Sequence, residues 1–247
     1  MNLKLITLIS CFLFLTACEK QPKAQKIIDK SIEVSGASVY ENSLIQFDFR
    51  DHHYLVERDK EKFKMMRVLK TDTSEIKDVL DNTSFSRFIN EEVVVVHDTM
   101  AFKYKESINS VTYFALLPYR LNDAAVQKKF LEEKLINERK YYKIQVTFQE
   151  EGGGADFEDV YVYWINAASY KIDFLAYSFN VNGGGFRFRE AYNERYVGGI
   201  RFVDYINYKP SVKVESVAEL DKLFINKQLE ELSKIELKNI SVSSAAF

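Results

Sequence analysis

Residues 141–210 read YYKIQVTFQEEGGGADFEDVYVYWINAASYKIDFLAYSFNVNGGGFRFREAYNERYVGGIRFVDYINYKP, and this stretch decides the fold. Aromatic and β-branched residues alternate with polar ones, as in Tyr142, Ile144 and Val146, and clusters of Gly and Asn interrupt the alternation. This pattern is typical of consecutive antiparallel strands joined by tight turns. The stretch therefore predicts a five-stranded meander at the centre of a large sheet.

The order of the turns predicts what lies at one end of that meander. Each hairpin reverses the chain, so alternate connections lie at the same end of the sheet. Residues 152–154 and 182–185 are the first and third connections, and both are rich in glycine. The rim that they form is expected to carry four charged residues, which could make either a polar binding mouth or an ordinary solvated loop surface: Asp156, Asp159, Arg187 and Arg189.

The first residues predict a leader rather than a part of the fold. Lys4 supplies a positive charge, residues 5–15 form an apolar run too short to span a bilayer, and Leu15-Thr16-Ala17-Cys18 follows. This segment resembles a bacterial lipobox, and the alternative is a secretory leader that happens to end near a cysteine. The resemblance implies a signal peptide over residues 1–17, a lipidated Cys18 with a tether over residues 18–25, and one domain over residues 26–247.

The same resemblance implies a location. A diacylated and palmitate-bearing Cys18 would attach the chain to a membrane, and Glu19 at the next position resembles the enteric sorting signal for the outer membrane, facing the periplasm. Cys11 lies in the leader, so the mature chain would contain no disulfide. With 34 basic and 36 acidic residues, the chain has no field that would attract nucleic acid. We expect a monomer.

Periodicity extends the prediction to the rest of the chain. The spacing of apolar residues predicts helices over residues 24–35, 100–120 and 217–229. Alternation of apolar and polar residues predicts strands over residues 45–50, 53–58, 63–70, 75–80, 84–89, 93–96 and 128–136. A closing strand is expected through Ile235, Leu237 and Ile240. The fold class is therefore α+β. We expect an open half-barrel of about ten or eleven strands that curls because of its size, with helices covering one face. Residues 100–120 would be a helical lid.

The order of these elements resembles a known superfamily. A lipobox, a first helix, Phe47-Asp48-Phe49-Arg50, a long meander and a helical lid are similar to the Lol lipoprotein carriers, in which an unclosed barrel holds acyl chains. Two further stretches, Asn109-Ser110-Val111 through Asn122-Asp123 and Tyr163-Trp164-Ile165-Asn166, resemble an uncharacterised family of Gram-negative envelope lipoproteins. Some members of that family carry a deoxyribose-phosphate aldolase label.

The residues do not support that label or another enzymatic reading. An aldolase of that kind uses a Schiff-base lysine in a (β/α)8 barrel, and the strands here follow one another without alternating helices. His52 and His53 would face opposite sides of a strand, and His97 has no further residue at metal-ligand spacing. The glycine triplets lack the Gly-Lys-Ser/Thr of a phosphate loop. We therefore expect no catalytic residue, no metal and no cofactor.

Tyrosines on both faces of the meander leave two interpretations open. One face could line a cavity, or the interior could be filled by its own side chains. The first predicts a non-enzymatic protein that binds an acyl chain, a lipid or a lipoprotein, and the second predicts an interaction module with partner-binding glycine loops. Under the first, the candidate ligand-lining residues are Phe47, Phe49, Tyr113, Phe114, Leu117, Trp164 and Tyr192.

Overall fold

The computed structural model describes residues 22–154, 157–180 and 183–245. Fourteen strands in these ranges form two antiparallel sheets of seven. The sheet A strands, in sheet order, are β14 (Lys238–Ser243), β1 (Asn42–Phe49), β2 (His52–Asp59), β3 (Lys62–Lys70), β4 (Glu75–Asp81), β5 (Phe85–Ile89) and β6 (Glu92–Val94). The sheet B strands are β13 (Leu229–Ile235), β12 (Ile200–Pro210), β11 (Gly185–Val197), β10 (Ile172–Phe179), β9 (Tyr161–Asn166), β8 (Arg139–Phe148) and β7 (Val126–Ile136).

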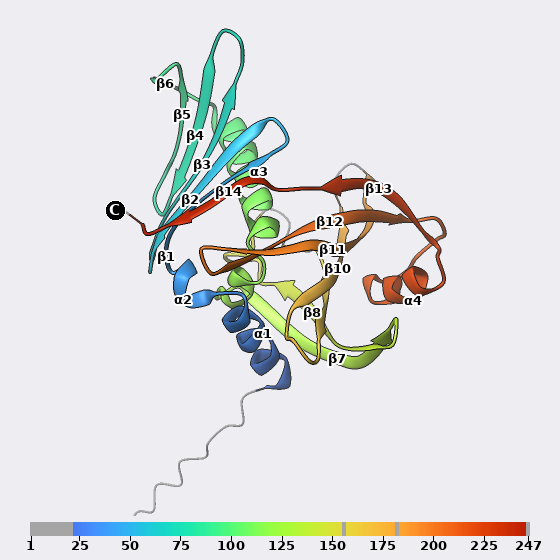
Figure 1. Ribbon diagram of the computed structural model, residues 1–247. Coiled ribbons are helices and arrows are strands. Elements are labelled where there is room, and N and C mark those ends of the chain that lie inside the picture. Colours follow the sequence, from blue (N-terminus) through green and yellow to red (C-terminus); the bar gives the residue numbers. More distant parts are fainter. Residues whose placement is uncertain (1–21, 155–156, 181–182, 246–247) are drawn as a thin grey trace, which may run out of the picture.

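The helices lie against these sheets (Figure 1). α1 (Lys23–Val34) and α2 (Ala37–Tyr40) precede the first strand, and α3 (Asp98–Ala115) with the 3-10 turn η1 (Tyr119–Asn122) separates the two runs of strands. The 3-10 turn η3 (Val217–Glu219) and α4 (Leu220–Ile225) come before β13. In the described part of the chain, none of these helices is long and apolar enough to cross a membrane.

Local sequence explains the tight hairpins. Residues Asn90-Glu91, Asn137-Glu138 and Gly198-Gly199 connect β5–β6, β7–β8 and β11–β12, and all six have positive φ. Two central residues with positive φ define a type I′ turn, whose twist matches that of the flanking strands. The β11–β12 turn also packs against Gly36, which lies between α1 and α2. A Cβ on Gly36 would lie 2.1 Å from the carbonyl oxygen of Gly199, so only glycine fits there.

The two sheets meet at one chain segment. β13 pairs with β12 at the edge of sheet B, and β14 pairs with β1 at the edge of sheet A. Only Glu236 and Leu237 separate these two strands, which run on in one direction as the dark red ribbon of Figure 1. The strands of both sheets therefore form one curved surface, and we call residues 236–237 the crossing.

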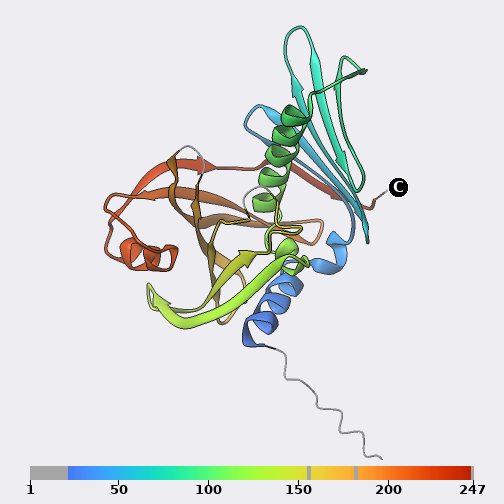
Figure 2. The ribbon, with the colours of Figure 1, turned by 180° about the vertical axis from the view of Figure 1, so that it is seen from behind.

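Helix α3 lies inside the bend of this surface. Figure 2 shows it running from sheet A toward sheet B, and it contacts β3, β4 and β5. Ile108 and Leu116 pack with Ile45 and Phe47 of sheet A in one hydrophobic cluster. Leu117 and Leu121, just after the helix, pack with α1 and the inner face of sheet B in a second cluster.

Sheet B is buried on both of its faces. On β9, Tyr163 and Ile165 face the inner cluster, whereas Val162 and Trp164 face a third cluster that Leu220 of α4 helps to form. The ion pair between the buried side chains of Lys143 and Asp221, 3.2 Å apart, fixes α4 on this outer face. This explains why aromatic residues occupy both faces of the meander.

The structure confirms the α+β class and the open antiparallel architecture and corrects four details. The described strands number fourteen rather than ten or eleven, and one of the added strands arises because the crossing divides the expected closing strand into β13 and β14. The C-terminal helix covers only η3 and α4, and the lid helix ends at Ala115, ahead of Pro118. Helices cover both faces of sheet B rather than one.

Candidate functional site

The C-terminal third of α3 separates two cavities. The larger, about 200 Å³, lies between α3, sheet B and the crossing, and we call it the inner cavity. The smaller, about 120 Å³, lies beneath the loop of residues 152–154, and we call it the glycine-loop cavity. Ser110 and Phe114 line both, because residues four apart share one face of a helix. Phe114 therefore borders both cavities.

Most of the inner cavity is apolar. Its lining side chains come from the end of β1 and the residue after it, from α3, from the strands β11, β12 and β13 of sheet B and from the crossing: Phe49, Arg50, Ser110, Val111, Phe114, Ala115, Arg189, Val203, Tyr205, Asn207, Ser233, Ile235 and Leu237. Val203, Tyr205 and Asn207 follow one another at alternate positions of β12, which places them on the same face. The cavity thus has a hydrophobic wall with a few polar groups.

Arg189 is the buried charge of this cavity. Its side chain belongs to a residue only 8% exposed, and its guanidinium carbon lies 3.9 Å from the centre of the Phe114 ring. Nη2 donates a hydrogen bond of 2.9 Å to the Tyr177 hydroxyl. The alternation of β11 directs Arg189 toward the inner face, while Phe188 packs in the outer cluster.

The glycine-loop cavity has a polar border and an aromatic floor. Arg120 donates from Nη1 to Asn109 (2.6 Å) and from Nε to Asp123 (2.9 Å), and all three residues line the cavity. Tyr113 lines the cavity, and its hydroxyl is hydrogen bonded at 2.7 Å to the hydroxyl of Tyr163, a fully buried residue outside the lining. Burial raises the pKa of both phenols above the ordinary value.

A third, more open hollow lies on sheet A. It measures about 560 Å³, and its border includes Asp48, His52, His53 and Lys70. His53 lies 2.6 Å from a carboxylate oxygen of Asp48. Across the described ranges, no group of three His, Cys, Asp or Glu side chains is arranged to hold a metal ion.

The structure brings together three of the seven candidate ligand-lining residues. Phe49 and Phe114 line the inner cavity, and Tyr113 and Phe114 line the glycine-loop cavity. The other four lie elsewhere: Phe47, Leu117 and Trp164 are buried in the hydrophobic clusters, and Tyr192 donates to Glu236 at the surface.

The four charged residues predicted for the glycine-loop rim do not form one exposed group in the described structure. Asp156 lies outside the described residues, and Arg187 is half-buried, stacked 4.7 Å from the Phe179 ring centre. Asp159 and Arg189 are 6% and 8% exposed, which corrects the alternative of a solvated loop surface for both. The reason is that β11 begins at Gly185, so Arg189 lies four residues inside the strand.

Sequence reasoning missed several lining residues. Val203, Tyr205 and Asn207 carried a detectable signal, because their alternation along one strand assigns them to one face. No sequence pattern indicates the other three residues, because they reach a cavity only through contacts between segments far apart in the chain: Ser110, Ser233 and Arg120.

Comparison with known proteins places the chain in a family. The model described as "Family of unknown function (DUF6503)" matches residues 3–237. The chain belongs to this family. The expectation of an uncharacterised family is thereby confirmed, and the search of curated proteins gives no significant match.

Solved structures with a similar arrangement share little sequence with this member of DUF6503. A LolA superfamily protein from Nitrosomonas europaea is 11% identical with a TM-score of 0.49, and the match covers 91% of this chain and 94% of that one. A DUF1329 family protein from Desulfovibrio piger is 8% identical (TM-score 0.41, covering 88% and 92%). Lipoprotein LppX of Mycobacterium tuberculosis is 12% identical (TM-score 0.31, covering 67% and 91%). The first of these belongs to the superfamily whose element order the sequence resembles.

Proposed function

We propose that this protein is a non-enzymatic, lipid-anchored protein of the cell envelope that binds the apolar part of a ligand, such as an acyl chain, in the inner cavity. The observation that carries the proposal is the largely apolar cavity between the lid helix α3 and the inner face of sheet B. Val111 and Phe114 of the helix face Val203 and Ile235 of the sheet side across it. Ligand pockets have this character: mostly apolar walls with a few placed polar groups.

The volume of the inner cavity sets a condition on binding. At about 200 Å³ it is smaller than the pockets of roughly 300–1,000 Å³ that hold drug-sized ligands. Rotation of Phe114 would join it to the glycine-loop cavity, because that side chain lines both. Binding of a long chain therefore requires that the Phe114 ring moves.

A filling substitution tests the proposal. Ala115 lines the inner cavity, so Ala115→Phe places a ring in the space proposed for the ligand. We expect wild-type protein to bind a fluorescent fatty-acid probe. Ala115→Phe should bind it at least about tenfold more weakly, which corresponds to a loss of about 1.4 kcal/mol of binding free energy. Ala101→Phe is the matched control, since Ala101 lies on the same helix but lines neither cavity.

The volume also favours the second candidate, an interaction module with a filled interior and partner-binding glycine loops. Gly152, Gly153 and Gly154 border the smaller cavity at one rim of sheet B. The same assay separates the candidates. A wild-type protein that takes up no apolar probe, together with early unfolding of Phe114→Ala, would remove the ligand-binding function and leave the interaction module.

The lipid anchor rests on the leader and has its own test. Cys18 lies outside the described residues, and Lys23 begins α1 shortly after it. We expect Cys18→Ser to give an unacylated protein that no longer fractionates with membranes. Fatty-acid labelling of Cys18→Ser at the wild-type level would contradict the anchor.

A further inference from the structure

We propose that Arg189 binds the anionic headgroup of an amphiphilic ligand whose chain lies along the apolar wall of the inner cavity. This inference rests on the proposed function and specifies the ligand class: a chain that ends in a carboxylate or a phosphate.

The hydrogen bonding of Arg189 is incomplete. A guanidinium carries five N–H donors and stays charged at any physiological pH. Nη2 donates to the Tyr177 hydroxyl, whereas among the described residues neither Nε nor Nη1 has a hydrogen-bond partner. Buried charges in folded proteins are normally paired, because desolvation without compensation is unfavourable. Arg189 lines the cavity, but neighbouring atoms cover Nε and Nη1. These donors can therefore receive an anion when the Phe114 ring, which lies against the guanidinium, moves.

Ring stacking holds the guanidinium in place. The Phe114 ring centre lies 3.9 Å and the Tyr177 ring centre 5.1 Å from the guanidinium carbon. Arginine stacks through its face and keeps its in-plane N–H groups free for carboxylate or phosphate oxygens. Phe114 thus contacts the proposed headgroup site and also lines the space proposed for the chain. When its ring moves to admit a long chain, Tyr177 still holds the guanidinium through its ring and its hydroxyl.

A polar row continues from Arg189 across the sheet. Arg189 is paired in register with Asn207 on β12, and Asn207 with Ser233 on β13. All three line the inner cavity. Asn207 donates from Nδ2 to the Ser233 hydroxyl (3.3 Å), and its Oδ1 has no partner within the described structure. This oxygen could accept from a hydroxyl of the headgroup beside the anion.

The charge of the cavity favours an anion. Arg189 and Arg50 are the charged residues of its described lining, which includes no Asp or Glu. Glu190 follows Arg189 in the chain but accepts from the Tyr208 hydroxyl (3.1 Å), and Tyr208 packs in the outer cluster. Arg50, an exposed residue just after β1, adds a second positive charge to the lining.

A ligand series tests the inference on the full-length protein by titration calorimetry. The probes are dodecanol, dodecyl phosphate, dodecyltrimethylammonium and inorganic phosphate. We expect wild-type protein to bind dodecyl phosphate about tenfold to hundredfold more tightly than dodecanol, the range expected for hydrogen bonds to a charged group. Arg189→Gln should lose this preference and keep its affinity for dodecanol. Arg187→Gln, an arginine two residues away that lines neither cavity, should retain the preference.

The possible outcomes distinguish the headgroup site at Arg189 from the proposed binding of an apolar ligand. Equal binding of dodecanol and dodecyl phosphate by wild-type protein, or an unchanged preference in folded Arg189→Gln, overturns the headgroup site and leaves apolar binding intact. Inorganic phosphate that binds as tightly as dodecyl phosphate also overturns it, because the chain would then play no part. No binding of any probe overturns both. If Arg189→Gln does not fold by circular dichroism, Arg189→Lys should fold and bind dodecyl phosphate less tightly than wild-type protein does.

Discussion

Asp48 connects three strands through its side chain. On β1 it receives a hydrogen bond of 2.6 Å from Nδ2 of Asn239 on β14, and its other oxygen lies 2.6 Å from Nδ1 of His53 on β2. The hydrogen bonds with Asn239 and His53 hold the pKa of Asp48 below its ordinary value. A carboxyl whose pKa is lower in the folded state stabilises the fold above its unfolded pKa, about 3.9, and loses that contribution as the pH falls through the folded pKa.

Removal of the Asn239 amide should reverse part of this effect. We expect Asn239→Ala to raise the pKa of Asp48 toward its ordinary value, measured by NMR titration of the carboxyl carbon. The free energy of unfolding should then fall less between pH 6 and pH 3 than in wild-type protein. Ser241→Ala on the same strand should leave the titration unchanged. A pKa of Asp48 that is the same in Asn239→Ala and wild-type protein would contradict the assignment.

At the residue scale, the sequence predicted which side chains are buried better than it predicted the cavity or sheet face that each of them occupies. The crowding of Tyr113 and Phe114 before Pro118 predicted side chains that contact a ligand, and both residues border a cavity in the structure. Leu117 comes three residues later and is buried in the core, because the helix ends at Ala115 and the chain turns there. Trp164 lies on the outer face of sheet B, which no local pattern could assign, since β9 is buried on both faces.

At the scale of elements, α3 is a lid whose middle is fixed to sheet A. Asp78 on β4 is 1% exposed and lies between two arginines, 2.5 Å from Nη2 of Arg67 and 2.7 Å from Nε of Arg87. Arg67 donates to the Ser107 hydroxyl of α3 (2.7 Å), and the Arg87 guanidinium carbon lies 3.5 Å from the Tyr104 ring centre. This buried cluster fixes the middle of α3 to sheet A, whereas the part with Phe114 lies over sheet B.

Asp78→Ala should therefore destabilise the protein strongly. Removal of one partner of a buried ion pair leaves an uncompensated charge and costs about 3–5 kcal/mol. We expect this loss in urea-unfolding experiments. Glu75→Ala on the same strand breaks a partly exposed pair with Lys70 and should cost about 0–1 kcal/mol. Equal midpoints for the two variants would show that the cluster does not hold the lid.

Periodicity predicted α3 as an element but not its attachment. Apolar residues at spacings of three and four located the helix to within a few residues at its start. Arg67, Asp78 and Arg87 come from three strands and meet only because β3, β4 and β5 are neighbours in sheet A. Charges in strands look like solvent-facing positions in a sequence, so their burial could not be read from it.

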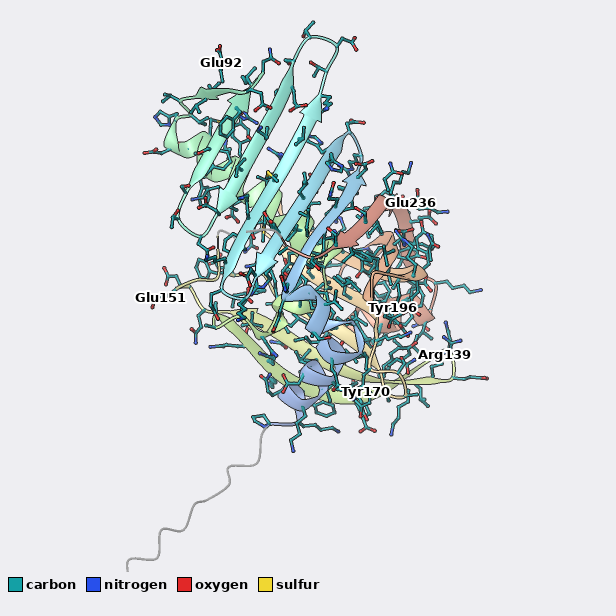
Figure 3. All side chains as sticks on the ribbon, turned by 60° about the vertical axis from the view of Figure 1, so that its left-hand side comes forward. Glu92, Arg139, Glu151, Tyr170, Tyr196 and Glu236 are labelled. Carbon is teal, nitrogen blue, oxygen red and sulfur yellow. The ribbon has the colours of Figure 1, made fainter. Side chains whose placement is uncertain are left out.

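At the scale of the whole molecule, the crossing joins the two sheets. The sequence predicted a single closing strand because the alternation of Ile235, Leu237 and Ile240 continues without a break. Alternation reports which face a side chain takes, and it does not report how many sheets a strand joins. The edges at the two ends of the curved surface lie far from this point, as Glu92 of β6 and Arg139 at the β7–β8 turn show in Figure 3.

Asp204 holds the crossing in place. This carboxylate on β12 is 2% exposed and accepts from the backbone N–H of Leu237 (3.0 Å) and from Nη2 of Arg195 (2.9 Å). The same Nη2 donates to the Leu237 carbonyl (2.8 Å). One charged pair thus satisfies both backbone groups of the residue at which the chain leaves sheet B, and Leu237 itself lines the inner cavity.

Asp204→Ala should consequently loosen the connection between the sheets before it unfolds either of them. The Leu237 N–H loses its acceptor and Arg195 its partner, so β13 and β14 should open locally at a lower free energy than the strands inside each sheet. Hydrogen exchange measures this: amides of β13 and β14 should exchange at least about tenfold faster than in wild-type protein, which corresponds to about 1.4 kcal/mol, while those of β2 and β10 change little. Glu236→Ala removes the neighbouring carboxylate, which accepts only from the Tyr192 hydroxyl among the hydrogen bonds described, and is the matched control. If exchange accelerated equally in all strands of Asp204→Ala, the two sheets would unfold as one cooperative unit, and Asp204 would not specifically stabilise the crossing between them.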